Sequence, residues 1–225
     1  MKSIKLIILS LLLCTLSAFP KASGNGLMGE ITLIGMAKSD SVVLDNKYFR
    51  VMQNSAACTE ANTPGFGSRV IVALADISFN SSNGVKNLKR GAIAVFQASG
   101  SYDLPKGEYF EVAFKLNHPP LKSPEEWIEP LKNTVIFEDE QFRIFEEKLA
   151  PGDDRELHSH AQRLVVRLND VQLTDPRFHE TAKSSSSGRQ VPNTVKFAEP
   201  VVHVVRNLSK DTQLFNIVIE FKVQH

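Results

Sequence analysis

Cysteine is scarce in this chain. Of its two cysteines, Cys14 lies in an N-terminal apolar run, so only Cys58 remains if that run is removed. A single cysteine cannot form an internal disulfide, and the fold must therefore be held together by packing. Cys58 itself is better explained as a small buried residue than as a ligand.

Long apolar segments are missing as well. The one apolar run, residues 6–16, falls well short of the roughly 20 residues that span a bilayer. It follows Lys2 and Lys5 and precedes small residues, which is the layout of a secretory signal peptide. We therefore expect residues 1–23 to be cleaved and the product to be exported, periplasmic or extracellular, without stable membrane insertion. An uncleaved membrane anchor is the alternative.

Charge of one sign is not in excess. Removing residues 1–23 takes away three lysines and no acid, which leaves 23 basic side chains against 25 acidic ones. No basic stripe occurs, so we expect no nucleic-acid partner. Gly-x-Ser-x-Gly and glycine-rich phosphate loops are also absent from the sequence, and the catalytic residues of any enzymatic activity stay unknown.

The remaining sequence is typical of β-structure. Short segments rich in Val, Ile and Phe alternate with clusters of Gly, Pro, Asn and Ser. One short helix is predicted at 123–130, with Ser123 as its N-cap and Pro124 in its first turn.

An internal repeat organises these segments. Four segments of the first half match four of the second half in the same order, which favours duplication over chance similarity between β-rich stretches. The matched segments are 48–51 with 141–144, 69–79 with 163–173, 91–95 with 200–204, and 111–115 with 218–222. We predict an all-β protein with two tandem antiparallel barrels or jelly rolls, at 38–116 and 132–225, joined by a linker at 117–131.

Three histidines of the second half form a candidate metal site. His158 and His160 are two residues apart, so both imidazoles point to the same face of an extended strand. His203, on another strand, could complete a facial site with them. Three neutral imidazoles suit Fe, Mn, Ni, Zn or Cu.

The spacing of these residues carries a family resemblance. Gly152-x5-His158-x-His160, followed by His203-x3-Asn207, resembles the two short motifs of the cupin family. The resemblance implies a bicupin-like exported protein made of two double-stranded β-helix barrels, with a metal or a small organic ligand in the second. Asn207, four residues after His203, is expected on the inward face of the same strand and in the ligand pocket.

The cupin pattern also has a glutamate four or five residues after the second histidine, where this chain has Leu164 and Val165. Without it, the ion would keep its full charge and favour an anionic ligand such as a carboxylate or thiolate. Glu156 has the parity to turn inward as a substitute. Arg163 or Arg167 could face a ligand carboxylate, with exposure on the barrel surface as the alternative.

The first half has no such donors. At the places of the three histidines the repeat puts Pro64, Phe66 and Ala94, so we expect the first barrel to be structural. For the whole chain two readings stay open. In the first, the second barrel of an exported protein binds a divalent metal, a small anionic organic ligand or both, and an enzymatic version would be a dioxygenase, isomerase or lyase. In the second, the chain is a non-metal, non-enzymatic binding or structural periplasmic barrel protein. It would act as a monomeric bicupin or a homodimer, with a small-molecule ligand as its partner.

Overall fold

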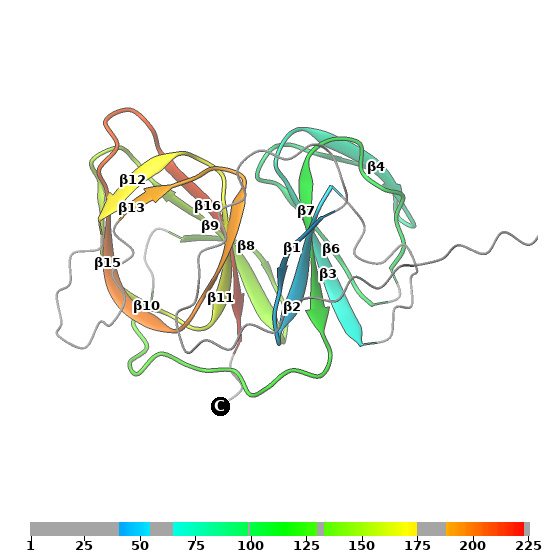
Figure 1. Ribbon diagram of the computed structural model, residues 1–225, viewed down its shortest axis with the longest axis horizontal. Helices are drawn as coiled ribbons and strands as arrows, with labels where there is room; N and C mark the ends of the chain where they lie inside the picture. Colours follow the sequence, from blue (N-terminus) through cyan, green and yellow to red (C-terminus); the bar gives the residue numbers. More distant parts are fainter. Residues whose placement is uncertain (1–40, 55–64, 99, 130–132, 175–187, 223–225) are drawn as a thin grey trace, which may run out of the picture. The chain divides into compact units, whose positions relative to one another are not determined.

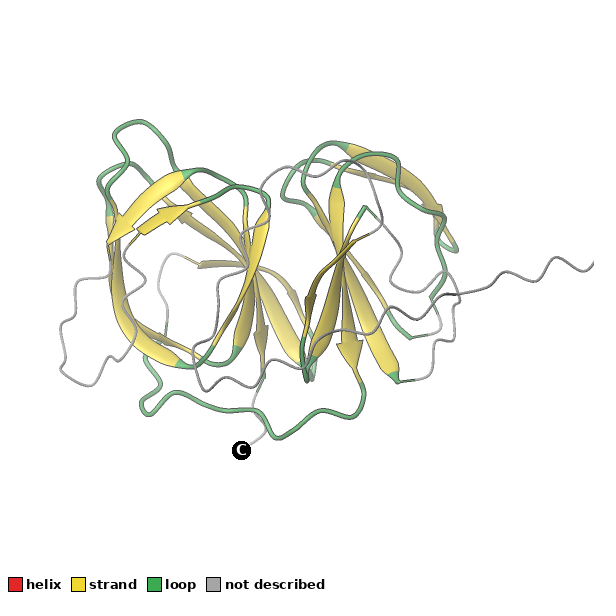
Figure 2. Cartoon of the chain, viewed as in Figure 1, coloured by secondary structure: helices red, strands yellow, loops and turns green. Residues whose placement is uncertain are grey.

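A computed structural model describes residues 41–54, 65–98, 100–129, 133–174 and 188–222. Its regular structure consists of sixteen β-strands, and Figure 2 shows no helix among the described residues. The predicted all-β class is therefore confirmed. The predicted signal peptide, Cys58 and Pro64 lie outside the described residues. In the described part of the chain, no helix is long and apolar enough to cross a membrane.

The strands fall into two sets along the chain (Figure 1). The first half contains β1 (Ser41–Asp45), β2 (Phe49–Gln53), β3 (Phe66–Ala73), β4 (Ile77–Ser81), β5 (Gly84–Leu88), β6 (Ile93–Phe96) and β7 (Tyr109–Lys115). The second half contains β8 (Asn133–Glu138), β9 (Phe142–Leu149), β10 (Asp154–His160), β11 (Arg163–Arg167), β12 (Val171–Thr174), β13 (Gly188–Gln190), β14 (Thr194–Ala198), β15 (Val201–Asn207) and β16 (Leu214–Phe221).

The two halves repeat one topology. The first half has a five-stranded sheet in the order β1-β2-β7-β3-β6, and the second has β8-β9-β16-β11-β14 in the equivalent order. The pairing registers of the strands agree as well. Arg69 of β3 pairs with Ala113 of β7, and their counterparts in the repeat, Arg163 of β11 and Glu220 of β16, pair in the same way. This topology supports the predicted duplication.

One part of the predicted alignment is wrong. In the pairing registers β6 corresponds to β14, since Val70 pairs with Val95 as Leu164 pairs with Phe197. Residues 91–95 therefore match 193–197 rather than 200–204, and Ala94 is not the counterpart of His203. Both segments are short and rich in small or β-branched residues, so their pattern alone could not separate the two registers.

A second sheet completes each half. In the second half it has the order β10-β15-β12-β13, and in the first half it is the two-stranded β4-β5. Leu149 and Leu214 of the five-stranded sheet pack with Val171 and Val205 of the smaller sheet, so the second half encloses an interior between its sheets.

The outward faces of the two five-stranded sheets contribute to one apolar core. Phe114 of β7 stacks on Phe142 of β9 at 4.5 Å between ring centroids, and alternate residues of both sheets join them. Burial of each large apolar side chain contributes about 1.5–3 kcal/mol. These strands read as nearly continuous apolar runs because their other faces are buried inside each half.

The predicted helix at 123–130 is not found. Residues 121–129 contain no helix, and Ile128 instead exchanges hydrogen bonds with Ser159 of β10. A helix of two turns has little intrinsic stability in water, so the pairing with β10 prevails.

Candidate metal centre

The three histidines meet on neighbouring strands inside the second barrel. His158 and His160 alternate along β10, and His158 lies directly opposite His203 of β15. The centroids of their rings are 4.8 Å apart for His158 and His160, 4.5 Å for His158 and His203, and 5.5 Å for His160 and His203. His158 and His160 are each 1% exposed and His203 is 9% exposed.

A β-bulge precedes the histidine pair. Arg155 is paired with Val205 while His158 is paired with His203, so β10 holds one extra residue between these two pairs. The bulge brings Arg155 and His158 to the buried face although they are three residues apart. Glu156 is left exposed, so the alternative in which its carboxylate turns inward as a substitute ligand is not realised. Simple alternation failed there because it assumes an unbroken ladder.

Hydrogen bonds fix which ring nitrogen each histidine presents. Nδ1 of His158 donates to the carbonyl oxygen of Glu156 at 2.7 Å, so the lone pair is on Nε2. That Nε2 is buried and has no hydrogen-bond partner among the described residues. Nδ1 of His160 contacts Oε1 of Glu220 at 3.1 Å, which leaves its Nε2 available as well.

The donor set fits a transition metal. The three ligand atoms, one from each histidine, lie within 4.8 Å of one another, and small side-chain rotations would bring them to metal–nitrogen bonds of about 2.0–2.1 Å. Burial, followed by the neighbouring His203, lowers the pKa of His158 to about 3. Burial and Arg163 hold the pKa of His160 well below its usual value. The neutral imidazole is the form that binds a metal.

Glu220 is the residue that orients His160. Its Oε1 also accepts from the backbone N–H of Ala161 at 2.9 Å, and its Oε2 accepts from Nε of Arg143 at 2.8 Å. Burial raises the pKa of Glu220, and Arg143 opposes that rise. A carboxylate on the far nitrogen of a ligand histidine fixes the ring and raises its basicity.

A second buried carboxylate, Glu147, belongs to a polar chain inside the barrel. Its Oε1 accepts from Nη1 of Arg155 and its Oε2 from Nδ2 of Asn216, both at 2.7 Å, and Asn216 accepts from Gln190 at 2.7 Å. Burial would raise the pKa of Glu147, but Arg155 and Asn216 outweigh it and hold the pKa below its usual value. Through Arg155, Glu147 is linked to β10, the strand that carries His158 and His160.

The residues predicted for the ligand pocket have other partners. Nδ2 of Asn207 donates to the carbonyl oxygens of Leu149 at 3.1 Å and Thr212 at 2.8 Å, so this amide ties neighbouring segments together. Arg163 is buried and donates to the carbonyl oxygen of Glu199 at 3.1 Å. Arg167 lies on the same strand face and is half-buried.

Gly152, the first residue of the histidine motif, shapes the turn before β10. Gly152 follows Pro151 and has a φ of 79°. The N–H of Asp153 donates a hydrogen bond to the carbonyl oxygen of Ala150 at 3.1 Å. Proline followed by a residue with positive φ is typical of a type II turn, which favours glycine at this place.

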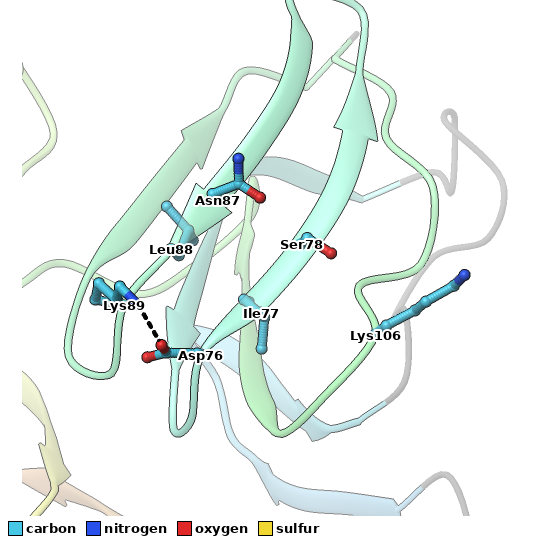
Figure 3. Close-up of a pocket in the computed structure, with 7 residues that line it drawn as sticks. All are labelled: Asp76, Ile77, Ser78, Asn87, Leu88, Lys89 and Lys106. Carbon is cyan, nitrogen blue, oxygen red and sulfur yellow. Dashed lines mark hydrogen bonds and ion pairs between the residues drawn. The ribbon is translucent and has the colours of Figure 1, made fainter.

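The interior of the first half is different. Ile71, Ala73 and Tyr109 of its large sheet pack against Ile77 and Phe79 of β4, where the second half has its polar cluster. Among the described residues, the only group of donor side chains arranged for a metal is the histidine cluster. A surface hollow of about 350 Å³ lies over β4 and β5, beside the exposed ion pair of Asp76 and Lys89 (Figure 3). It carries no comparable set of donors.

Sequence reasoning missed Glu147, Glu220 and Arg155. A signal for the two glutamates exists, because each shares the inward face of its strand with two apolar residues, Phe145 and Leu149 on β9 or Leu214 and Val218 on β16. Arg155 could not be found in this way, since its orientation depends on the bulge.

Comparisons with known proteins bear on the fold. No protein-family model and no curated protein matches the chain. Among solved structures, a Pseudomonas aeruginosa protein described as glyoxylate induced is similar with a TM-score of 0.53 at 11% identity, over 79% of this chain and 75% of that one. A cupin 2 conserved barrel domain protein from Leptotrichia buccalis is similar with a TM-score of 0.48 at 13% identity, over 82% and 88%.

A single cupin domain from Bordetella pertussis Tohama I is 26% identical, with a TM-score of 0.35, over 45% of this chain and 97% of its own. The duplicated sheets, the paired histidine strands and the likeness to the Pseudomonas aeruginosa structure agree with one another. The protein therefore has the all-β fold that its resemblance to bicupins implies, with two barrels in one chain.

Proposed function

We propose that the second barrel binds one divalent transition metal ion through Nε2 of His158, His160 and His203. The observation that carries this proposal is the buried, unpartnered Nε2 of His158, which lies in a cluster whose ligand atoms are within 4.8 Å of one another. A buried polar atom without a partner is costly, and an ion at the centre of the cluster would remove that cost.

The chemistry follows from the donor set. An ion of Fe, Mn, Ni, Zn or Cu would supply a Lewis acid or a redox centre when bound. The chain's own residues hold the imidazoles: Glu220 orients His160, the carbonyl of Glu156 orients His158, and burial excludes bulk water. Three protein ligands leave coordination positions open for a small organic molecule, and this is the proposed ligand site.

We also propose a location, a partner, an assembly and a role of the first barrel for the whole chain. We place the protein outside the cytoplasm, periplasmic or extracellular, because of the signal-peptide pattern in residues 1–23. Its partner would be a small molecule and not a nucleic acid, and the chain would act as a monomeric bicupin or a homodimer. The first barrel would be a structural support, since its described residues include no group of donor side chains arranged for a metal.

Metal analysis of the protein, prepared without a histidine tag, tests the metal site. After incubation with each ion and removal of the excess, we expect about one metal per chain in the wild type and in His118→Ala, whose histidine is exposed. His158→Ala and His203→Ala should lose that metal. Equal metal in all four proteins, or none in any, would contradict the proposal and favour a barrel that binds its ligand without metal.

A further inference from the structure

We propose that the second barrel is built to bind a small carboxylate, held by the free edge of the Arg155 guanidinium. The carboxylate end of the ligand would contact Arg155, and its other end would face the histidine cluster. In this second respect the inference rests on the proposed function. It names the class of ligand that the site takes.

The unsatisfied hydrogen-bonding capacity of Arg155 is the main observation. The residue is 1% exposed, and its Nη1 donates to Oε1 of Glu147 at 2.7 Å. Its Nε and Nη2 are buried without a hydrogen-bond partner among the described residues. These two nitrogens form one side of the planar guanidinium, the side on which a carboxylate accepts two parallel hydrogen bonds.

The position of Arg155 matches the proposed site. The bulge in β10 turns it to the same buried face as His158. Across the strands, Arg155 pairs with Val205, two residues from His203, while His158 pairs with His203 itself. A ligand bridging Arg155 and the cluster would therefore be small.

The charge of the interior points the same way once an ion is bound. The buried charged side chains of β9, β10, β11 and β16 balance, with Arg155 and Arg163 against Glu147 and Glu220. A divalent ion on neutral imidazoles would make this interior net positive. Burying net positive charge is costly, and an anionic ligand offsets it.

Acetate and its neutral isostere acetamide are the probes. In metal-free protein at constant ionic strength, we expect acetate to raise the thermal midpoint and to bind in calorimetry, while acetamide does neither. The double variant Arg155→Met with Glu147→Gln removes both charges together, so that no unpaired carboxylate is left buried. It should bind acetate at least roughly tenfold more weakly, because two charge-assisted hydrogen bonds are lost.

Two further variants keep the test decisive. Arg155→Lys retains the charge beside Glu147 without the planar edge and should also weaken acetate binding. Arg206→Met, which removes an exposed arginine paired with Asp154, should bind acetate like the wild type. Acetate binding that is equal in all variants, or equal for acetate and acetamide, overturns the inference.

The acetate experiment can support or overturn the carboxylate site independently of the metal proposal. Acetate binding that depends on Arg155 in a protein that takes up no metal would support the carboxylate site and sink only the metal centre. A protein that binds metal through the histidines but shows no response to acetate would overturn only the carboxylate site.

Discussion

Two glutamates give the second barrel the carboxylates that its histidine motif lacks. Glu220 contacts Nδ1 of His160, and Glu147 pairs with Arg155, so the carboxylates near the histidines orient or balance other groups. An ion held by the three imidazoles would then keep its full charge. This arrangement is the physical reason to expect an anionic ligand in the barrel.

Glu220→Gln tests the orienting role of this residue. The amide keeps the size and can still accept from His160, but it loses the charge that makes the imidazole a stronger donor to a metal. We expect metal affinity to fall by about tenfold without loss of the fold. Glu138→Gln, at an exposed carboxylate of β8 paired with Lys222, is the matched control and should bind metal like the wild type. Equal affinities in the two variants would mean that Glu220 has no role at the site.

The sequence predicted the histidine cluster but not its surroundings. Spacing alone placed His158 and His160 on one strand face, because alternation needs no knowledge of neighbouring strands. Glu147 and Glu220 reach the site from β9 and β16, so their role follows only from the pairing of distant strands. The alternative in which Glu156 turns inward is not realised, because of the bulge between Arg155 and His158.

At the scale of elements, strand order was more predictable than register. The match between 69–79 and 163–173 aligned β3 with β11, because a shared arginine and aspartate anchor it. β6 and β14 lack such anchors, and their correspondence appears only in the sheet order. The segment at 121–129 carries helix signals but forms no helix, since Ile128 pairs with β10.

The turn between β5 and β6 brings the two halves close together. Gly91 has a φ of 83°, and a Cβ there would lie 2.5 Å from Cζ of Phe215. Gly84 has a similar φ of 92° but open space around it, so Gly84→Ala carries the backbone strain alone. We expect Gly91→Ala to lower the free energy of unfolding by about 1–3 kcal/mol more than Gly84→Ala does. Chemical denaturation measures the difference, and equal losses would show that the contact with Phe215 is unimportant.

At the scale of the molecule, the shared apolar core predicts one cooperative unit. Phe114 of the first half is 6% exposed and stacks on Phe142 of the second. Phe114→Ala should destabilise both halves together, lowering a single calorimetric transition by roughly 10 °C. Leu116→Ala, at a side chain that is 58% exposed, should change it little. Two separate transitions, of which only one moves, would show that the halves unfold independently.

A metal ion held in one of the two barrels is the proposal on which the function of this chain depends. Diffraction from crystals of the zinc-loaded protein, recorded on both sides of the zinc absorption edge, locates the ion directly. We expect one anomalous peak per chain, at bonding distance from Nε2 of His158, His160 and His203. A peak on other residues, or no peak in crystals that contain stoichiometric zinc, would contradict the proposal.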